Sequence, residues 1–338
     1  MKHDYRLIVV YQCKNLGDAL LTTPLVIGLL ERFPAARVIV VCKPASLPIF
    51  ESLSQRVRVF SKPEGMGDWL ALLGAILQHS NRCVWLPHTS TAGLALAKLT
   101  LSKSVSPSPI QHRLLGRADF TCPVRLSPWR HTADTLLDSL RLLGYEIRDA
   151  DRRVHVRSLL DRHVEPVSGI PDAKYVVIHP GSRWMFKSPR PEVWFQICRN
   201  LSTKGYSIVV TGGAGLEEKS VCEWLGNIPS VINLAGKTDL YQLAQLIKNA
   251  RGFIGIDTFS MHLAAGLGIP GVILFGPTSE IIWGPYGMDN RLHVITSDHS
   301  CRPCHTDGCG GGKVSDCLDT LDPDMVTETF VRVLDGNE

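Results

Sequence analysis

The segment at residues 253–280 constrains the fold of this chain more than any other. Residues 252–256 form a short apolar run that predicts a strand, and a polar turn follows at residues 257–260. Small residues predict a helix at 261–266, and a second strand is expected at 271–275. A strand, turn, helix and strand in this order are the unit from which parallel sheets are built. The polar turn should therefore lie at the carboxyl end of a parallel strand, where open α/β sheets bind ligands.

The residues of this turn predict a ligand that is a sugar carrying a phosphate. Backbone N–H groups at the start of the helix favour an anion, and the helix dipole adds to this preference. Asp257 would repel a bare phosphate, but it can accept hydrogen bonds from sugar hydroxyl groups. Thr258 and Ser260 belong to the same turn, whereas His262 is as well explained as a buried helix histidine without a ligand.

Length and composition indicate two ordinary soluble domains. The chain has 338 residues, which predicts two domains of about 150 residues each. Hydrophobic residues make up 44% and charged residues 20%. No apolar run approaches the roughly 20 residues that span a bilayer, and the run at residues 7–11 is too short for a signal-peptide core. Ten cysteines without an export signal favour free thiols in a reducing compartment, so we expect a cytoplasmic protein.

Short β-branched runs alternate with helical patterns along most of the chain. The expected strands are 7–11, 38–42, 57–60, 83–86, 175–179, 207–211, 231–233, 253–256, 272–275 and 293–295. The expected helices include 19–32, 68–78, 133–143, 192–204, 217–225 and 240–249. This alternation predicts parallel sheets built from βαβ units. The fold class is therefore α/β, with two Rossmann-like, doubly wound parallel-sheet domains that face a central cleft.

A charge-rich segment that contains Pro and Gly, residues 149–172, is the expected domain boundary. It places a first domain at residues 1–160, with a short edge strand at 154–156, and a second domain at 170–322. An Asp-Pro pair is a helix-start signal. It predicts a C-terminal helix within residues 323–338, which we expect to pack back on the N-terminal domain.

The first half of the chain is basic and the second half is acidic. Residues 1–165 carry 22 Lys and Arg against 14 Asp and Glu, whereas residues 166–338 carry 14 against 18. One interpretation is ordinary variation of surface charge between domains. The other is that the first half meets an anionic partner, such as nucleic acid, a phosphorylated glycolipid or a membrane surface. Arg113, Arg117 and Arg130 are candidate contacts, and no nucleic-acid-binding motif accompanies them.

Other turns after predicted strands also carry chemically useful residues. Asp18 falls at the start of a helix, where an acid either caps the helix for about 1 kcal/mol or acts as a general base on an attacking hydroxyl. Ser182 and Lys187 lie in a loop that either binds a diphosphate or is simply solvated. Together, Asp18 on one domain and Lys187 with Asp257 on the other would suit transfer of a glycosyl group from a nucleotide donor.

The turn at Gly213 precedes two acids, Glu217 and Glu218, and suits contacts to the ribose of a nucleotide. It is not a dinucleotide fingerprint, because no G-x-G-x-x-G follows the first strand, and the chain has no Walker A lysine motif. The missing fingerprint argues against a nicotinamide-dependent oxidoreductase.

Three motifs of the chain together resemble a known family. They are NLGDALLTTP at residues 15–24, IHPGSRWMFK at 178–187 and GIDTFSMHLAAGLGIPGVILFGPT at 255–278. In this order and at this spacing they resemble glycosyltransferase family 9, the heptosyltransferases of lipopolysaccharide core assembly. The resemblance covers nearly the whole chain. It implies a GT-B fold, an acceptor-binding first domain, a nucleotide-sugar-binding second domain, inversion at the sugar carbon and no required cofactor.

The resemblance also implies roles for individual residues. Asp18 matches the family's proposed general base, Lys187 the lysine that meets the donor phosphates, and Asp257 the acid that holds heptose hydroxyls. The other residues expected to bind the donor are Ser182, Gly213, Glu217, Glu218, Thr238, Thr258, Phe259, Ser260 and His262. Two departures are that the chain reads KSPRP from Lys187 onward, where an aromatic–proline pair is usual, and that Phe259 is bulkier than usual. A donor other than heptose therefore stays open.

The resemblance implies an enzyme that moves a heptose or a related sugar from an ADP-sugar to a hydroxyl of the lipopolysaccharide inner core. It also implies a cytoplasmic protein in peripheral contact with the inner membrane, whose partners are a nucleotide sugar and an anionic glycolipid. Two alternatives stay open. One is a protein-modifying heptosyltransferase of the autotransporter type, and the other is a non-catalytic relative that only binds a nucleotide sugar.

Four cysteines near the C-terminus, Cys301, Cys304, Cys309 and Cys317, form the remaining candidate site. The first two have the C-x₂-C spacing of Zn or Fe thiolate ligands, and neighbouring glycines would let the loop wrap a metal. The other spacings are irregular. The cysteines therefore either hold a structural metal ion or are thiols that bind nothing.

Overall fold

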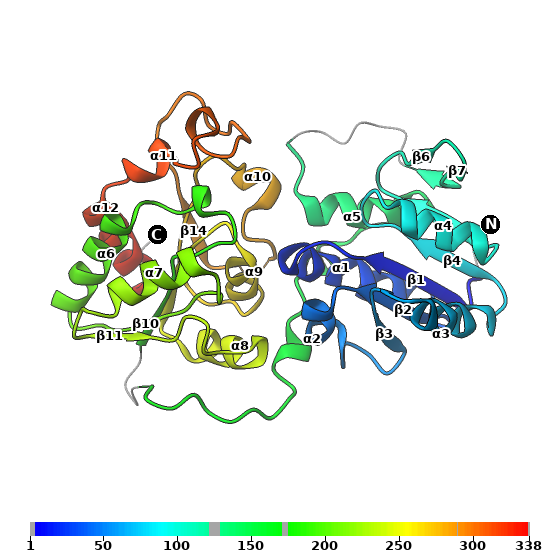
Figure 1. The fold of residues 1–338 in the computed structure, drawn as a ribbon, viewed down its shortest axis with the longest axis horizontal. Coiled ribbons are helices and arrows are strands. Elements are labelled where there is room, and N and C mark those ends of the chain that lie inside the picture. The colour runs from blue at the N-terminus through cyan, green and yellow to red at the C-terminus, as the bar shows by residue number, and fades with distance from the viewer. Residues whose placement is uncertain (1–3, 122–128, 171–174, 289, 337–338) are drawn as a thin grey trace. The chain divides into compact units, whose positions relative to one another are not determined.

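The structure is a computed structural model that describes residues 4–121, 129–170, 175–288 and 290–336. The chain divides into two compact units, Met1–Asp161 and Arg162–Glu338. Each unit is built on its own six-stranded parallel sheet with helices on both faces (Figure 1). The α/β class predicted from the alternation of strands and helices is confirmed.

The first sheet has the strand order β3-β2-β1-β4-β5-β8. Its strands are β1 Leu7–Gln12, β2 Arg37–Cys42, β3 Val57–Ser61, β4 Arg82–Trp85, β5 Lys103–Ser106 and β8 Phe120–Thr121. The helices are α1 Leu16–Arg32, α2 Leu47–Phe50, α3 Met66–Leu77, α4 Thr91–Leu99 and α5 Thr132–Arg141. Short 3₁₀ turns are η1 Pro44–Ser46, η2 Asp149–Asp151 and η3 Arg157–Leu159, and β6 Gln111–His112 pairs antiparallel with β7 Gly116–Arg117.

Alternate side chains of β1 show why this sheet forms. Leu7, Val9 and Tyr11 are almost completely buried and pack with helices α3 and α4 on one face. Chain order reverses between β1 and β4, which are neighbours in the sheet. The loops that follow these two strands therefore lie at a topological switch point, the preferred ligand position in open α/β sheets.

The second sheet repeats this plan in the order β11-β10-β9-β12-β13-β14. Its strands are β9 Tyr175–His179, β10 Ser207–Val210, β11 Val231–Asn233, β12 Gly252–Ile256, β13 Gly271–Leu274 and β14 Leu292–Ile295. The helices are α6 Pro191–Thr203, α7 Leu216–Leu225, α8 Leu240–Asn249, α9 Phe259–Gly266, α10 Glu280–Trp283, α11 Asp316–Asp319 and α12 Pro323–Leu334. The 3₁₀ turns are η4 Met185–Lys187 and η5 Cys309–Gly311. The switch point here lies between β9 and β12.

The structure corrects two of the sequence expectations. The C-terminal helix α12 packs on α6 and belongs to the second unit, not the first, because Val326 and Phe330 complete that unit's core. Residues 154–156 form no strand; the N–H of His155 instead donates to Oγ1 of Thr23, 2.9 Å away. Each of the ten predicted strands overlaps an observed one, and β5, β6, β7 and β8 were not predicted.

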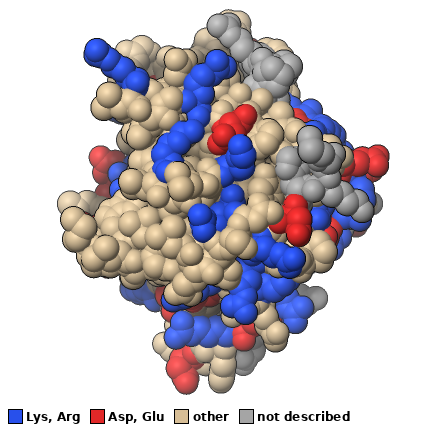
Figure 2. Space-filling view, turned by 90° about the vertical axis from the view of Figure 1, so that its right-hand side faces the viewer, with Lys and Arg blue, Asp and Glu red and all other residues tan. Residues whose placement is uncertain are grey.

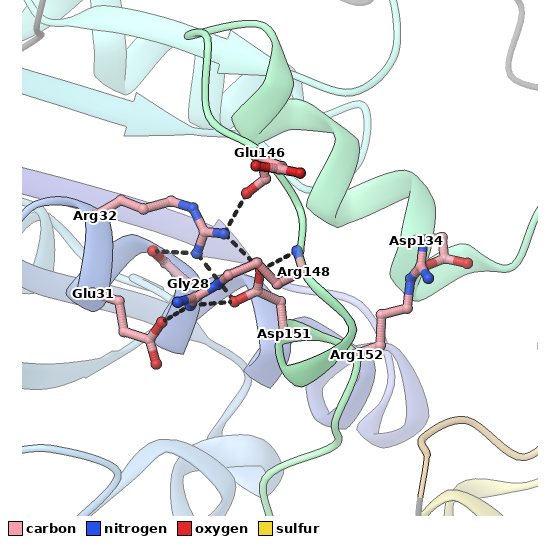
Figure 3. Close-up of polar contacts among 8 residues, drawn as sticks. All are labelled: Gly28, Glu31, Arg32, Asp134, Glu146, Arg148, Asp151 and Arg152. Carbon is pink, nitrogen blue, oxygen red and sulfur yellow. Dashed lines mark hydrogen bonds and ion pairs between the residues drawn. The ribbon is translucent and has the colours of Figure 1, made fainter.

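Helix α1 is fixed at its C-terminal end by a buried ion pair (Figure 3). The guanidinium of Arg32 donates to both carboxylate oxygens of Asp151, at 2.6 and 3.3 Å, and Arg148 also donates to this carboxylate. Burial alone would raise the pKa of Asp151, but the hydrogen bonds from Arg32 and Arg148 outweigh it and hold the pKa well below its usual range. The pair therefore anchors α1 to the segment that follows α5.

Candidate active site

In the second unit, Lys187 and Asp257 meet at the carboxyl edge of the sheet. Lys187 ends the turn η4 after β9, and Asp257 directly follows β12, the neighbouring strand. Nζ of Lys187 donates to Oδ2 of Asp257 over 2.7 Å. The two side chains are 21% and 7% exposed, so the charges are largely shielded from water and each depends on the other. Two motifs that are far apart in the sequence thus form one charged pair at the switch point.

The start of helix α9 leaves backbone donors beside this pair. Thr258 is the N-cap residue, but its side chain does not cap the helix and lies 2.8 Å from Oγ of Ser260 instead. Phe259 begins the helix, and Ser260 and His262 are buried within its first turns. The N–H groups of the first turn can therefore serve an anion next to Asp257.

The turn after β10, which contains Gly213, contacts Glu218 rather than its neighbour Glu217. The N–H of Gly213 donates to Oε2 of Glu218 over 2.6 Å, whereas Glu217 is exposed. A Cβ atom on Gly181 would lie 2.8 Å from Cγ of Glu218, and one on Gly213 would lie 2.7 Å from its Oε2. The Glu218 carboxylate thus occupies space that only glycine leaves open. An acid in this position suits hydroxyl donors such as those of ribose, and it would repel a phosphate.

The remaining residues predicted to bind the donor lie around the same edge. Ser182 is buried, and its hydroxyl accepts the N–H of Trp184. The turn that contains Thr238 is tied to the Gly213 turn, because the N–H of Gly236 donates to the carbonyl of Gly212 over 2.9 Å. The structure thus brings the predicted donor-site residues of this unit to one sheet edge.

His179 links two of these turns and was not predicted as a site residue. Its Nδ1 lies 2.9 Å from Oγ1 of Thr211, so the ends of β9 and β10 are joined by a side-chain hydrogen bond. Burial lowers the pKa of His179 to about 4, which keeps the ring neutral at pH 7. Its place at the end of a buried strand was the available signal. The sequence could not show its partner, because β10 lies about 30 residues further along the chain.

In the first unit, Asp18 lies at the start of helix α1, as predicted. Its Oδ2 accepts the N–H of Asn15 over 3.2 Å, which makes Asp18 the third helical residue of a capping box. The carboxamide of Gln12 donates to the carbonyl of Asp18 and to Oγ1 of Thr22, which holds this turn against the end of β1. Asp18 therefore takes part in capping as the third helical residue, whereas the N-cap position itself belongs to Asn15. The half-buried carboxylate also lies at the switch point of its sheet.

The three arginines expected to bind an acceptor are not gathered into one site. Arg113 and Arg117 are exposed on the β6–β7 hairpin. Arg130 pairs with Asp138 of helix α5, with Nε 2.6 Å from Oδ2. The charge of Arg130 is thus balanced by an acidic residue of the same unit. Sequence reasoning missed three lysines at the carboxyl edge of the same sheet, Lys14, Lys43 and Lys62, each one or two residues after a strand.

The four C-terminal cysteines were a candidate metal site, and the described residues are not arranged as one. Cys317 is buried, and burial raises the pKa of its thiol to about 11, with the nearby Cys309, Cys301 and Cys304 adding to the rise. The thiols therefore lie near one another. However, Sγ of Cys309 accepts the N–H of Asp316, and Sγ of Cys304 lies 3.1 Å from Oγ1 of Thr306. Within the described ranges, no three His, Cys, Asp or Glu side chains are arranged to hold a metal ion.

Comparisons with known proteins show which family the chain resembles. The family model for glycosyltransferase family 9 (heptosyltransferase) matches residues 143–314. The chain is 27% identical over 305 residues to lipopolysaccharide heptosyltransferase 3 of Escherichia coli strain K12, covering 85% of this chain and 87% of that protein.

Two solved structures share the fold. A glycosyl transferase of family 9 from Veillonella parvula superposes with a TM-score of 0.76 at 20% identity, covering 99% of both chains. ADP-heptose lps heptosyltransferase II of E. coli superposes with a TM-score of 0.72 at 18% identity, covering 97% of this chain and 98% of that one.

Proposed function

The chain belongs to glycosyltransferase family 9, and we propose that it transfers a heptose from ADP-heptose to a hydroxyl group of the lipopolysaccharide core, with inversion at the sugar carbon. The single observation that carries this proposal is the Lys187–Asp257 pair, in which two family motifs meet at the switch point of one sheet. The name of heptosyltransferase 3 of E. coli supports the acceptor class, and the name of the solved E. coli heptosyltransferase II, which includes ADP-heptose, supports the donor.

The donor is held by the second unit. Lys187 and the first N–H groups of α9 neutralise the diphosphate, Asp257 accepts hydrogen bonds from heptose hydroxyls, and Glu218 accepts them from the ribose. Because Lys187 contacts Asp257, one ammonium group can serve both the sugar-binding acid and the leaving phosphate. Stabilising the departing ADP in this way lowers the barrier to breaking the bond between the sugar and the phosphate.

The acceptor is activated by the first unit. Asp18 removes the proton from the attacking hydroxyl, which then bonds to the sugar carbon while ADP leaves from the opposite side. The capping box fixes the carboxylate, since its Oδ2 already accepts the N–H of Asn15.

Helix α3 supports a peripheral contact with the cytoplasmic membrane surface, where the acceptor lipid is embedded. Met66, Leu70 and Leu77 are 76%, 62% and 54% exposed and fall on one side of the helix. Figure 2 shows a face on which Lys and Arg side chains border a broad area without charge, as expected of a surface that meets anionic lipid. No helix of the described ranges is long and apolar enough to cross a membrane.

A transfer assay with two acceptor classes tests the proposal. Purified protein is incubated with ADP-heptose and either truncated lipopolysaccharide core or a protein acceptor. The masses of the products are then measured by mass spectrometry. We expect a mass increase of one heptose on the lipopolysaccharide core alone. Transfer to the protein alone would instead indicate the protein-modifying alternative. Binding of ADP-heptose without transfer to either would indicate a non-catalytic relative.

A thermal-shift panel of ADP-, UDP- and GDP-sugars tests the donor independently. A ligand that binds only the folded protein raises its stability by RT ln(1 + [L]/Kd). We expect ADP-heptose to raise the melting temperature more than any UDP- or GDP-sugar. Equal shifts with all nucleotide sugars would contradict the proposed donor.

A further inference from the structure

Three lysines lie together at the carboxyl edge of the first sheet. Strands β1, β2 and β3 are adjacent and end in register. Lys43 and Lys62 are the first residues after β2 and β3, and Lys14 is the second residue after β1. The N–H of Lys62 donates to the carbonyl of Cys42, which places the backbones of these strand ends in direct contact. The topology therefore collects three ammonium groups from separate parts of the sequence.

These lysines lie close enough to act on the same neighbours. Burial raises the pKa of Cys13, and the charges of Lys62 and Lys43 oppose that rise. Burial and, to a smaller extent, the charges of Lys14 and Lys43 together lower the pKa of His88 to about 4. A single positive field thus covers the ends of β1 to β4.

Acidic side chains do not neutralise this field. In the described ranges, none of the three lysines has an ion-pair partner, and Lys43 donates to the neutral Oδ1 of Asn15 over 3.3 Å. Several arginines elsewhere in the same unit do have acidic partners. Those that pair with Asp or Glu are Arg6, Arg32, Arg130, Arg141, Arg148, Arg152 and Arg157. Uncompensated like charges at one edge repel one another, so an anion bound there would be stabilised.

His88 adds an independent sign of an unfilled site. It follows β4, the neighbour of β1 at the switch point. Its Nδ1 is buried and has no hydrogen-bond partner among the described residues. A buried polar atom without a partner costs about 1–3 kcal/mol, which a ligand or a ligand-bound water would recover.

We infer that Lys14, Lys43 and Lys62 form a subsite for a phosphate group carried by the acceptor, next to the hydroxyl that is activated by Asp18. Asn15 connects the two functions, because its N–H donates to Asp18 and its side-chain oxygen accepts from Lys43. The inference rests on the proposed glycosyl transfer and identifies the acceptor as a phosphorylated sugar.

A phosphate fits this subsite better than a carboxylate does. Lysine ammonium groups are compact point charges that can surround a dianion from several directions. The three strand ends supply lysines and no arginine. A phosphate monoester, with close to two negative charges at pH 7, also gains more than a singly charged carboxylate from three cations.

The test compares two acceptors and two variants. Lipopolysaccharide core from a strain that lacks this enzyme is used before and after dephosphorylation with hydrogen fluoride. The variant K14A/K43A/K62A is compared with K98A, which removes one exposed lysine from helix α4 of the same unit. We expect the triple variant to raise the KM of the phosphorylated acceptor at least about tenfold, because each charged hydrogen bond contributes about 1.5–3 kcal/mol. The KM of ADP-heptose should stay unchanged, and K98A should behave as wild type.

Each other outcome overturns the inference in a recognisable way. An equal effect on both acceptors would show that the lysines do not bind the acceptor phosphate. A raised KM for ADP-heptose would assign them to the donor. If the wild type transfers nothing, the proposed function fails, and the subsite is tested alone by NMR titration of the His88 ring signals with mannose 6-phosphate against mannose. Shifts with the phosphate only, lost in the triple variant, would support the subsite, and the absence of such shifts would refute it.

Discussion

The two ends of helix α1 differ in whether their charged side chains are paired within the protein. At its C-terminal end, Arg32 donates twice to the buried carboxylate of Asp151, and Arg148 contacts the same group (Figure 3). At its N-terminal end, three lysines gather near Asp18 without acidic partners in the described ranges. Charge at the first end is satisfied within the protein and holds the fold together. Charge at the second end is left for a ligand, which separates a structural role from a functional one.

The second unit shows an intermediate arrangement. Lys187 and Asp257 are paired, as at the structural end of α1, but they lie at the carboxyl edge of a sheet, as the lysines do. A pair in this position can be rearranged by a ligand that contacts both partners. Location relative to the sheet therefore distinguishes the functional edge more reliably than pairing alone.

The largest expected effect is the loss of turnover on changing Asp18. The variant D18N keeps a hydrogen-bond acceptor for Asn15 but loses the basic carboxylate, so transfer should fall roughly 10²- to 10⁴-fold. Binding of ADP, measured by calorimetry, should stay within about twofold of wild type. D18A should lose the same activity and also about 1 kcal/mol of stability, because the capping interaction is removed. Normal turnover by D18N would exclude Asp18 as the base.

At the opposite end of α1, the expected effect is on stability and its dependence on pH. Because the pKa of Asp151 lies below its usual value, the ion pair contributes stability above about pH 4 and loses that contribution as the pH falls towards the folded-state pKa. D151N leaves the buried Arg32 uncompensated and should lower the free energy of unfolding at pH 7 by about 3 kcal/mol.

The matched control for D151N is E31Q, which removes a half-exposed partner of Arg148 from the same cluster. It should cost less than about 1 kcal/mol. Urea unfolding at pH 7 and pH 3 measures both variants. A wild type that loses no more stability than D151N between these two pH values would show that the pair does not anchor the helix.

Changing Lys187 tests whether the pair in the second unit serves the donor. K187A removes one cation from the diphosphate and leaves Asp257 without its partner, so the Kd of ADP should rise roughly tenfold to a hundredfold. K248A removes an exposed lysine from α8 of the same unit and should leave this Kd unchanged. If calorimetry shows an unchanged affinity of K187A for ADP, the pair has only a structural role.

The smallest expected effects come from two glycines in contrasting places. In G181A the new Cβ lies 2.8 Å from Cγ of Glu218, so the acid must move, and stability should fall by about 1–2 kcal/mol while ADP binds more weakly. Gly74 lies inside helix α3, where an added Cβ would meet no other atom within 4 Å, so G74A should raise stability by about 0.5–1 kcal/mol. Urea unfolding measures both variants. A gain of stability in both variants would show that Glu218 is not closely held against Gly181.

Much of the fold could be predicted from the sequence, because strands that are buried on both faces appear in it as short apolar runs. Strand β5 and the edge strand β8 were missed since Lys103–Ser106 and Phe120–Thr121 are short and at least half polar. In the candidate site, Asp257 could be found because it directly follows a strand, and Asp18 because it lies in the first turn of a helix, whereas Lys187 was found through its motif in the loop after a strand. Arg130 was assigned to a ligand because its acidic partner, Asp138, is recognisable only once helix α5 is folded.

By itself, the sequence determined the α/β class, the order of the strands along the chain and the turns that carry the reactive residues. These depend on hydrophobic periodicity and turn chemistry, which act between residues close together in the chain. Only the tertiary structure decided that Glu218 and not Glu217 lies over Gly181, that α12 completes the second core, and that three lysines gather beside Asp18. Burial and charge pairing act through space, so they are set when strands that are distant in the sequence become neighbours in a sheet.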